Sequence, residues 1–224
     1  VHPDAYDHVT RAYLLEEEGR FQEAVAQLRQ ALLFDDDAAE LYARMAENLL
    51  RIDRLEDAER AGRASLERGV TVPGLIAEAH VRQARGNTAG AIPSLQKAVQ
   101  LVEFASDPDE AMLAYYELAD ARILALDVAE AASTLRELAR LAPDPSAVRV
   151  RLAAALWSLG DLVQAEAEIT SSIEADPSQI DAILFLAWLH AAQGRAAPAR
   201  ALFSEALERS EGALEVALAY ARYL

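Results

Sequence analysis

The chain contains no cysteine among its 224 residues. This absence excludes a disulfide framework, a cysteine-ligated metal site and a thiol nucleophile, although it does not identify a compartment. The glycine-rich motifs that bind nucleotides and the G-x-S-x-G motif of serine hydrolases are also missing. No segment brings an acid, a base and a nucleophile together. We therefore expect the chain not to be an enzyme and to bind no cofactor.

Positive charge is scarce, because 21 Lys and Arg residues stand against 37 Asp and Glu residues and give a formal net charge of −16 at pH 7. An acidic chain is repelled by phosphate backbones, so we expect no nucleic acid partner. Long hydrophobic runs and basic amphipathic stretches are lacking, so we expect no direct membrane insertion. Lys97 is the only lysine, and this bias toward arginine in an alanine-rich chain is typical of GC-rich bacterial coding.

The chain begins at Val1 instead of Met, which we interpret as the start of a processed protein or of a fragment. A signal peptide or a tether would then be out of view. The compartment is therefore unknown from the sequence: cytoplasmic by default, and periplasmic if a signal peptide was removed.

Histidine is rare as well, and the chain has four. One group near the start could in principle hold a metal ion, and it consists of His2, Asp4, Asp7 and His8. A solvated chain end explains the same residues without a ligand. We expect no metal site.

Alanine is the residue that the chain does have in a regular pattern. One column is spaced by 34, 33, 40, 34, 34 and 34 residues, and it consists of Ala12, Ala46, Ala79, Ala119, Ala153, Ala187 and Ala221. A second column follows the first by 12 residues each time, at Ala24, Ala58, Ala91, Ala131, Ala165 and Ala199. Self-similarity at this period is the signature of a helical-repeat array, so the columns predict an all-α solenoid.

Each period reads as two amphipathic helices joined by a tight turn. The turn column holds glycine at four of six positions, and glycine favours the left-handed backbone that ends a helix. Its members are Gly19, Asp53, Gly86, Leu126, Gly160 and Gly194. Asp107 and Asp176, each followed by proline, are predicted to cap the next helix.

This pattern resembles the tetratricopeptide repeat family over nearly the whole chain. Residues 199–203, with Ala199 and Phe203, match the A-x3-F part of the family signature, and Pro143 and Pro177 match its closing proline. Pentatricopeptide arrays, which bind RNA, have a similar period, but the acidic charge argues against them. The resemblance implies a right-handed superhelix whose first helices line a concave groove.

The repeat boundaries follow from the columns. We expect a single solenoid over residues 1–224, with repeats at about 5–38, 39–71, 72–111, 112–145, 146–179 and 180–213 and a terminal helix at 214–224. The 40-residue interval adds six residues around 101–106, which predicts either a longer helix or a loop, and possible use as a hinge. Pro93 is expected to remove one backbone hydrogen bond inside a helix.

The resemblance also implies which residues face the groove, namely those six and three before each first-column alanine and one, four and five after it. The candidate residues for partner binding are Tyr13, His80, Tyr116, Asp120, Val150, Trp157, Leu184 and Trp188. Exposed aromatics in a concave surface are common anchors in peptide recognition. The alternative is that Trp157 and Trp188 pack between neighbouring repeats or beneath the last helix.

The resemblance implies a non-catalytic scaffold that binds a segment of a protein partner in its groove. The helix at 214–224 has apolar residues all round, so self-assembly through exposed ends, including a homo-oligomer through this helix, is a second hypothesis. A third hypothesis is a recruiting domain of a larger enzyme, regulator or secretion component. The sequence names no partner, because folds of this class serve unrelated tasks.

Overall fold

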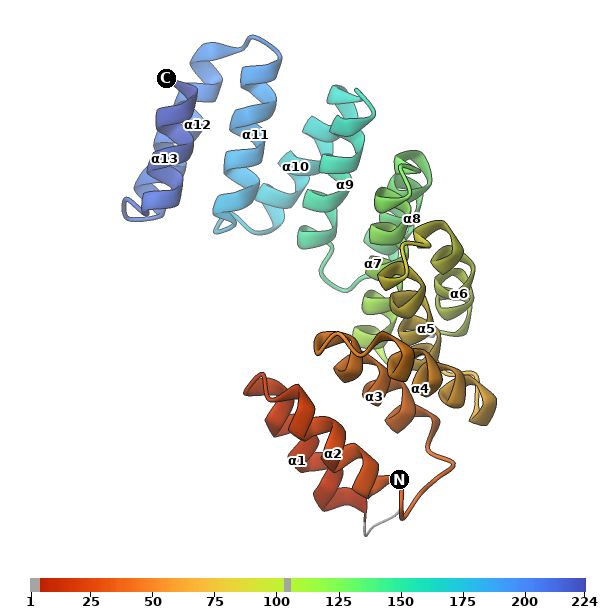
Figure 1. Cartoon of the computed structure of the whole chain (residues 1–224). Coiled ribbons are helices and arrows are strands. Elements are labelled where there is room, and N and C mark those ends of the chain that lie inside the picture. Colours follow the sequence, from red (N-terminus) through yellow and green to blue (C-terminus); the bar gives the residue numbers. More distant parts are fainter. Residues whose placement is uncertain (1–4, 103–105) are drawn as a thin grey trace. The chain divides into compact units, whose positions relative to one another are not determined.

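A computed structural model describes residues 5–102 and 106–224, and these residues form thirteen α-helices and no strand (Figure 1). The all-α prediction is therefore confirmed. The chain divides into two compact units, Val1–Leu126 and Asp127–Leu224, which we call the N-terminal unit and the C-terminal unit and describe separately. A single continuous array over both units stays a prediction.

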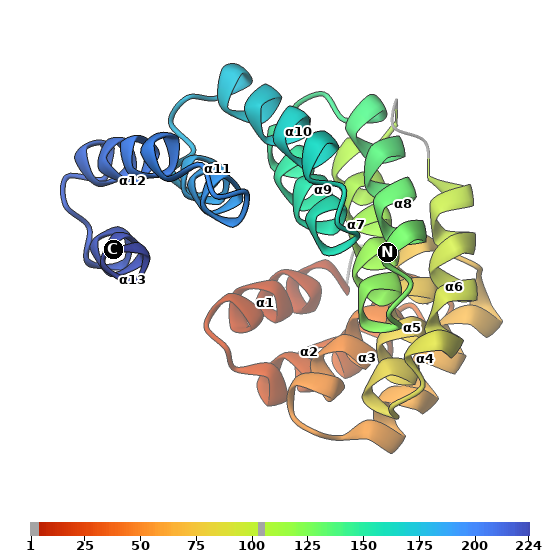
Figure 2. The ribbon, with the colours of Figure 1, turned by 90° about the horizontal axis from the view of Figure 1, so that it is seen from above.

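The N-terminal unit contains three helical hairpins and one further helix. Its helices are α1 (Tyr6–Glu17), α2 (Phe21–Ala31), α3 (Ala39–Arg51), α4 (Leu55–Arg68), α5 (Val72–Ala84), α6 (Thr88–Leu101) and α7 (Pro108–Leu124). Helix α5 has α3 on one side and α7 on the other (Figures 1 and 2).

The C-terminal unit contains two helical hairpins between two further helices. Its helices are α8 (Val128–Leu141), α9 (Ser146–Ser158), α10 (Leu162–Ala175), α11 (Ile180–Ala192), α12 (Ala196–Arg209) and α13 (Leu214–Tyr223). The last helix, α13, packs on α12 and α11 (Figure 1).

The alanine columns are the closest packing points of the hairpins. Every alanine of both columns is fully buried, except Ala221 on α13, which is exposed. A small side chain at these points lets two helix backbones approach, and a larger one would force them apart. The alanine columns therefore allow the close helix packing on which the predicted repeat architecture depends.

The turn column adopts the left-handed backbone at all six positions. The φ angle is 73° at Gly19, 76° at Gly86, 80° at Gly160 and 74° at Gly194. The two residues that are not glycine follow the same path, with φ of 55° at Asp53 and 63° at Leu126. The prediction of helix-ending turns is confirmed. The left-handed backbone at Leu126 is energetically unfavourable for leucine, because its Cβ atom crowds the backbone.

The two predicted aspartate caps have different outcomes. The Oδ1 atom of Asp107 accepts a hydrogen bond of 2.9 Å from the backbone N–H of Glu110, so Asp107 caps α7 as predicted. The prediction for Asp176 is wrong, because this residue ends α10 and its carboxylate accepts from the N–H of Ser178 in a turn. The next helix begins only at Ile180, after Gln179.

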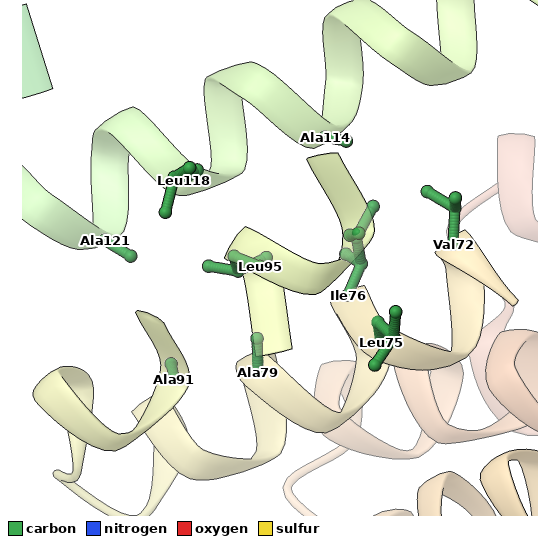
Figure 3. Close-up of a cluster of buried hydrophobic side chains, with 10 residues drawn as sticks. Val72, Leu75, Ile76, Ala79, Ala91, Leu95, Ala114, Leu118 and Ala121 are labelled. Atoms are coloured by element: carbon green, nitrogen blue, oxygen red, sulfur yellow. The ribbon is translucent and has the colours of Figure 1, made fainter. Parts of the chain in front are cut away.

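A core cluster shows how one hairpin joins its neighbour. Side chains from α5, α6 and α7 meet in it, with Leu95 of α6 fully buried between Ile76 of α5 and Leu118 of α7 (Figure 3). These buried side chains hold α7 against the preceding hairpin. Burial of each large aliphatic side chain contributes roughly 1.5–3 kcal/mol to folding.

The six inserted residues precede a helix that is longer than its counterparts. Helix α7 has 17 residues, whereas α3 and α5 have 13 each. The extra turn lies at the N-terminal end of α7, which agrees with the predicted lengthening. The possible hinge at 101–106 lies partly outside the described residues. Helix α6 continues through Pro93.

Candidate binding groove

The first helices of the N-terminal unit enclose a groove of about 740 Å³. Side chains of α1, α3, α5 and α7, with Phe21 of α2 and the cap residue Asp107, line it. The lining residues are Val9, Tyr13, Glu16, Phe21, Glu40, Leu41, Ala43, Arg44, Glu47, Asn48, Arg51, Val72, Pro73, Ile76, His80, Asp107, Asp109, Glu110, Leu113 and Glu117.

Helical periodicity explains why these residues share one surface. On α1, Val9, Tyr13 and Glu16 lie three or four residues apart, and side chains at this spacing lie on one face of a helix. On α3, Ala43, Glu47 and Arg51 repeat the spacing. Stacking of the hairpins then places these faces next to one another, so the groove follows from the repeat.

A polar cluster joins α1 to α3 at the groove surface. The Nε atom of Arg44 donates a hydrogen bond of 3.0 Å to Glu16 Oε1, and a second guanidinium nitrogen pairs with Glu16 Oε2. The Nδ2 atom of Asn48 donates to the same carboxylate and to the carbonyl oxygen of Arg44. The guanidinium of Arg44 also lies over the ring of Tyr13. The donors of Asn48 are used within this cluster.

A histidine joins α3, α5 and α7 in the same way. Both ring nitrogens of His80 lie 2.8 Å from a carboxylate oxygen, Nδ1 from Glu47 and Nε2 from Glu117. Burial alone would lower the pKa of His80, but the hydrogen bonds and negative charges of Glu117 and Glu47 raise it to about 10. The ring is therefore a cation at neutral pH, and it donates both of its N–H groups within the fold.

Negative charge collects where α3, α5 and α7 begin. Glu40 lies in the first turn of α3, Asp107 caps α7, and Asp109 and Glu110 lie in the first turn of α7. We call these four residues the acidic end of the groove. Burial and the negative charges of Asp107 and Glu40 raise the pKa of Glu110 above its usual value. The extra turn of α7 thus brings three of the four carboxylates to the groove.

The predicted groove residues of the N-terminal unit fall in two places. Tyr13 and His80 line the groove. Tyr116 and Asp120 lie on α7, outside the lining residues, and both are partly buried. That Tyr13 and His80 bind a partner stays a prediction, although the ring nitrogens of His80 are occupied by carboxylates.

The other predicted residues belong to the C-terminal unit. Trp157 makes an edge-to-face contact of 5.1 Å with Phe185 of α11, and Trp188 makes one of 5.0 Å with Phe203 and one of 6.4 Å with Tyr223 of α13. These contacts are the ones expected from the alternative interpretation, in which the two tryptophans pack between neighbouring repeats or beneath the last helix. Val150 and Leu184 are partly buried, and Leu184 packs against the core around Ile183 and Val216. A partner-binding role for these four residues stays a prediction.

Several lining residues were not among the predicted ones. Glu40, Ile76 and Leu113 follow the register rule, six or three residues before a column alanine, so the rule could have found them. Arg44, Asn48 and Glu117 lie two residues from a column alanine and do not follow it. Asp107, Asp109 and Glu110 depend on the longer α7, which the sequence left undecided.

Neither a metal cluster nor a membrane span is found in the part of the chain that the structure describes. Over residues 5–102 and 106–224, no group of three or more His, Asp or Glu side chains is arranged to hold a metal ion. No helix in these ranges combines the length and the apolar character that crossing a membrane requires. His2 and Asp4 lie outside the described residues, and the Nδ1 atom of His8 is 2.8 Å from Gln27 Oε1.

Stacked helical hairpins with alanine packing points and a groove on their first helices define a helical-repeat protein. Two segments of the chain, residues 8–37 and 123–189, match the tetratricopeptide repeat family. These two segments are therefore tetratricopeptide repeats. None of the curated protein sequences is similar enough to the chain to count as a match.

Solved structures of the same architecture have low sequence identity to the chain. PilF of Pseudomonas aeruginosa is 16% identical, with a TM-score of 0.72 over 98% of this chain and 96% of that one. PilW, a type IV pilus biogenesis factor, is 15% identical, with a TM-score of 0.74 over 97% and 99% of the two chains. A signal transduction ATPase with a tetratricopeptide repeat sensor, from Pyrococcus horikoshii, is 18% identical, with a TM-score of 0.77 over 97% of this chain and 37% of its own. These likenesses show the fold alone.

Proposed function

We propose that this protein is a non-catalytic scaffold for protein–protein interaction, and that the groove of the N-terminal unit binds a segment of a protein partner. The observation that carries the proposal is the groove itself, about 740 Å³ in volume and lined by the first helices. Two large side chains on its surface are about half exposed, Tyr13 at 47% and Leu113 at 48%. Large side chains of this kind, open to solvent in a concave surface, support recognition of an extended or helical peptide.

The tetratricopeptide repeats support the class of function and not a pathway. The similar structures include a pilus biogenesis factor and the sensor of an ATPase, so one architecture serves different tasks. The partner must therefore be identified by experiment.

A photo-crosslinking experiment tests the proposal. A photoreactive phenylalanine analogue is placed at Leu113 in the groove or at Leu33, which is 75% exposed and outside the lining residues. Both variants are irradiated in cells of the source organism, and crosslinked segments are identified by mass spectrometry. We expect a defined partner segment from position 113 and not from position 33. The same segments from both positions would refute groove binding.

A matched pair of substitutions then measures the contribution of the groove. Loss of a leucine side chain that a partner covers should cost about 1–2 kcal/mol of binding free energy, or roughly tenfold in affinity. Leu113→Ala should therefore weaken binding of the crosslinked segment, and Leu33→Ala should not. Equal affinities for the two variants would place binding elsewhere.

Self-association is a second candidate because α13 exposes leucine. Leu214 is 72%, Leu218 50% and Leu224 77% exposed. A second copy that covers these side chains would remove apolar surface from water. Sedimentation over a range of concentrations should then show a dimer that Leu214→Ser/Leu218→Ser abolishes, and a monomer at every concentration would reject this candidate.

A further inference from the structure

Most positive charge of the groove is paired within the fold. The guanidinium of Arg44 forms an ion pair with Glu16, and both N–H groups of His80 donate to Glu47 and Glu117. The amide nitrogen of Asn48 donates to Glu16 and to the carbonyl oxygen of Arg44. Arg51 is the remaining cation of the lining, and it lies at the last turn of α3, at the other end of that helix from Glu40. At the end where α3 begins, the groove therefore offers acceptors.

The acceptors at the groove include one buried amide oxygen and the four carboxylates of the acidic end, of which Asp107 already accepts one hydrogen bond as the cap of α7. Glu40, Asp107, Asp109 and Glu110 make no ion pair with any residue in the described ranges. Asn48 lines the same groove with only 3% of its surface exposed, and its Oδ1 atom has no donor among the described residues. An unsatisfied buried acceptor is costly, typically about 1–3 kcal/mol. Asn48 lies eight residues after Glu40 on α3, about 12 Å along the helix, so its oxygen is a separate acceptor of the groove and not part of the acidic end.

Stabilisation of the helices does not explain the acidic end by itself. Carboxylates in the first turn of a helix interact favourably with the helix dipole, and Asp107 also caps α7. At Glu110 this benefit is outweighed, because burial and the charges of Asp107 and Glu40 raise its pKa. Asp107 and Glu40 repel the charge of Glu110, and a cation would relieve that repulsion.

We propose that the acidic end of the groove holds an arginine or lysine side chain of the partner segment. This inference rests on the proposed function, and it specifies the chemistry of the partner. Guanidinium and ammonium groups carry only donors, and their hydrogen bonds to carboxylates are among the strongest in proteins. The aliphatic stem of either side chain can lie against Leu113, Ile76 and Pro73, which line the groove beside the carboxylates.

The partner segment therefore has a direction. Its basic residue lies where α3, α5 and α7 begin, over Glu40 and Glu110. Its opposite end approaches Arg51, at the last turn of α3, and an acidic residue or a C-terminal carboxylate suits that position. A segment with the reverse order of charges would meet like charges at both ends.

An array of short random peptides is the probe for this inference. The purified chain is compared with Asp109→Asn/Glu110→Gln, which removes two charges from the acidic end. The control Asp36→Asn/Glu56→Gln removes two charges from exposed positions outside the groove. Each retained peptide is also made with citrulline in place of arginine and norleucine in place of lysine. Thermal melts establish that all variants are folded.

The expected result is enrichment of arginine and lysine in the retained peptides. Their affinity should fall about tenfold or more in the groove variant and on neutralisation of the peptide, and the control should keep it. Retained peptides that depend on Leu113 but bind equally well without their basic residues would overturn this inference and leave the groove function standing. Retention of no peptide, or retention that neither Leu113→Ala nor the acidic variant changes, would overturn both.

Discussion

The guanidinium carbon of Arg44 on α3 lies 3.3 Å from the centroid of the Tyr13 ring on α1. The two residues belong to different hairpins, and both line the groove. The same arginine is paired with Glu16, so its position is set by an ion pair and by a ring face together. The groove surface therefore also joins the first hairpin to the second.

Replacement of Tyr13 by leucine should destabilise the N-terminal unit. A cation over an aromatic ring contributes about 0.5–1 kcal/mol at an exposed site and up to about 2 kcal/mol when desolvated. We expect Tyr13→Leu to lower the free energy of unfolding within this range, as measured by urea denaturation. Tyr6→Leu is the matched control, because Tyr6 is on the same helix and is 68% exposed. Equal losses in the two variants would contradict a role for the ring over Arg44.

Stability of the N-terminal unit should depend on alkaline pH through His80. A folded-state pKa of about 10, raised from 6.5, means that the folded state binds the proton more tightly than the unfolded state. The stabilisation is complete below pH 6.5 and is lost as the pH rises through about 10. Urea denaturation at a series of pH values should show this loss in the unmodified chain.

The substitution His80→Gln separates this effect from other titrations. Glutamine keeps a hydrogen-bonding side chain but cannot carry the charge. The difference in free energy of unfolding between the unmodified chain and His80→Gln should therefore shrink as the pH rises. Contributions that are the same in both proteins cancel in the comparison. If this difference in free energy of unfolding were the same at neutral and alkaline pH, the protonated His80 would not be what stabilises the contact with Glu47 and Glu117.

Neutralisation of Glu110 should stabilise the protein at neutral pH. A carboxyl group with a raised folded-state pKa favours folding while it is protonated, and this benefit disappears as the pH rises above 4.5 and through the folded-state value. Glu110→Gln imitates the protonated form, so its melting temperature should exceed that of the unmodified chain at pH 7 and approach it in acid. Glu56→Gln, at an exposed first-turn position of α4, should give no such increase. A lower melting temperature for Glu110→Gln would mean that the charge stabilises the fold.

Replacement of Leu126 by glycine should stabilise the chain. The φ angle of 63° at Leu126 costs a leucine about 1 kcal/mol, and glycine adopts it without that cost. The side chain is 87% exposed, so little packing is lost with it. We expect Leu126→Gly to raise the free energy of unfolding by about 1 kcal/mol. Leu126→Ala shortens the side chain but leaves the backbone strain in place. An equal rise in the free energy of unfolding from alanine would therefore point to a cause other than the backbone.

The sequence predicted the fold because its strongest signal is a packing constraint. A fully buried position such as Ala119 or Ala153 tolerates only a small side chain, so the repeat is visible as columns of alanine. The turn at Leu126 was predicted from its column even though leucine has no preference for it. The repeat boundary at 180 coincides with the start of α11, but the capping role of Asp176 was predicted wrongly, because Asp176-Pro177 forms a turn of its own before the helix begins.

The groove was less predictable than the fold. Its register followed from the repeat, but the acidic end depends on an extra helical turn after an insertion of six residues, and a loop was an equally good interpretation of that length. The hydrogen bonds of His80 to Glu47 and Glu117 join three helices, α3, α5 and α7, and the periodicity within one helix does not predict contacts between helices. The contacts of Trp157 and Trp188 depend on rotamers and neighbours, which residue identity alone does not specify.

The bridges across the groove limit how this surface can change during evolution. Tyr13, Arg44 and Glu16 hold one pair of hairpins, and His80 with its two glutamates holds the next. A substitution at any of these residues changes the groove surface and also the contact between two repeats. Such a substitution therefore lowers the stability of the fold. In the described structure, Leu113, Asp109 and Arg51 take part in none of these bridges between repeats. Drift toward a new partner would begin at these three positions, and divergent relatives should differ there first.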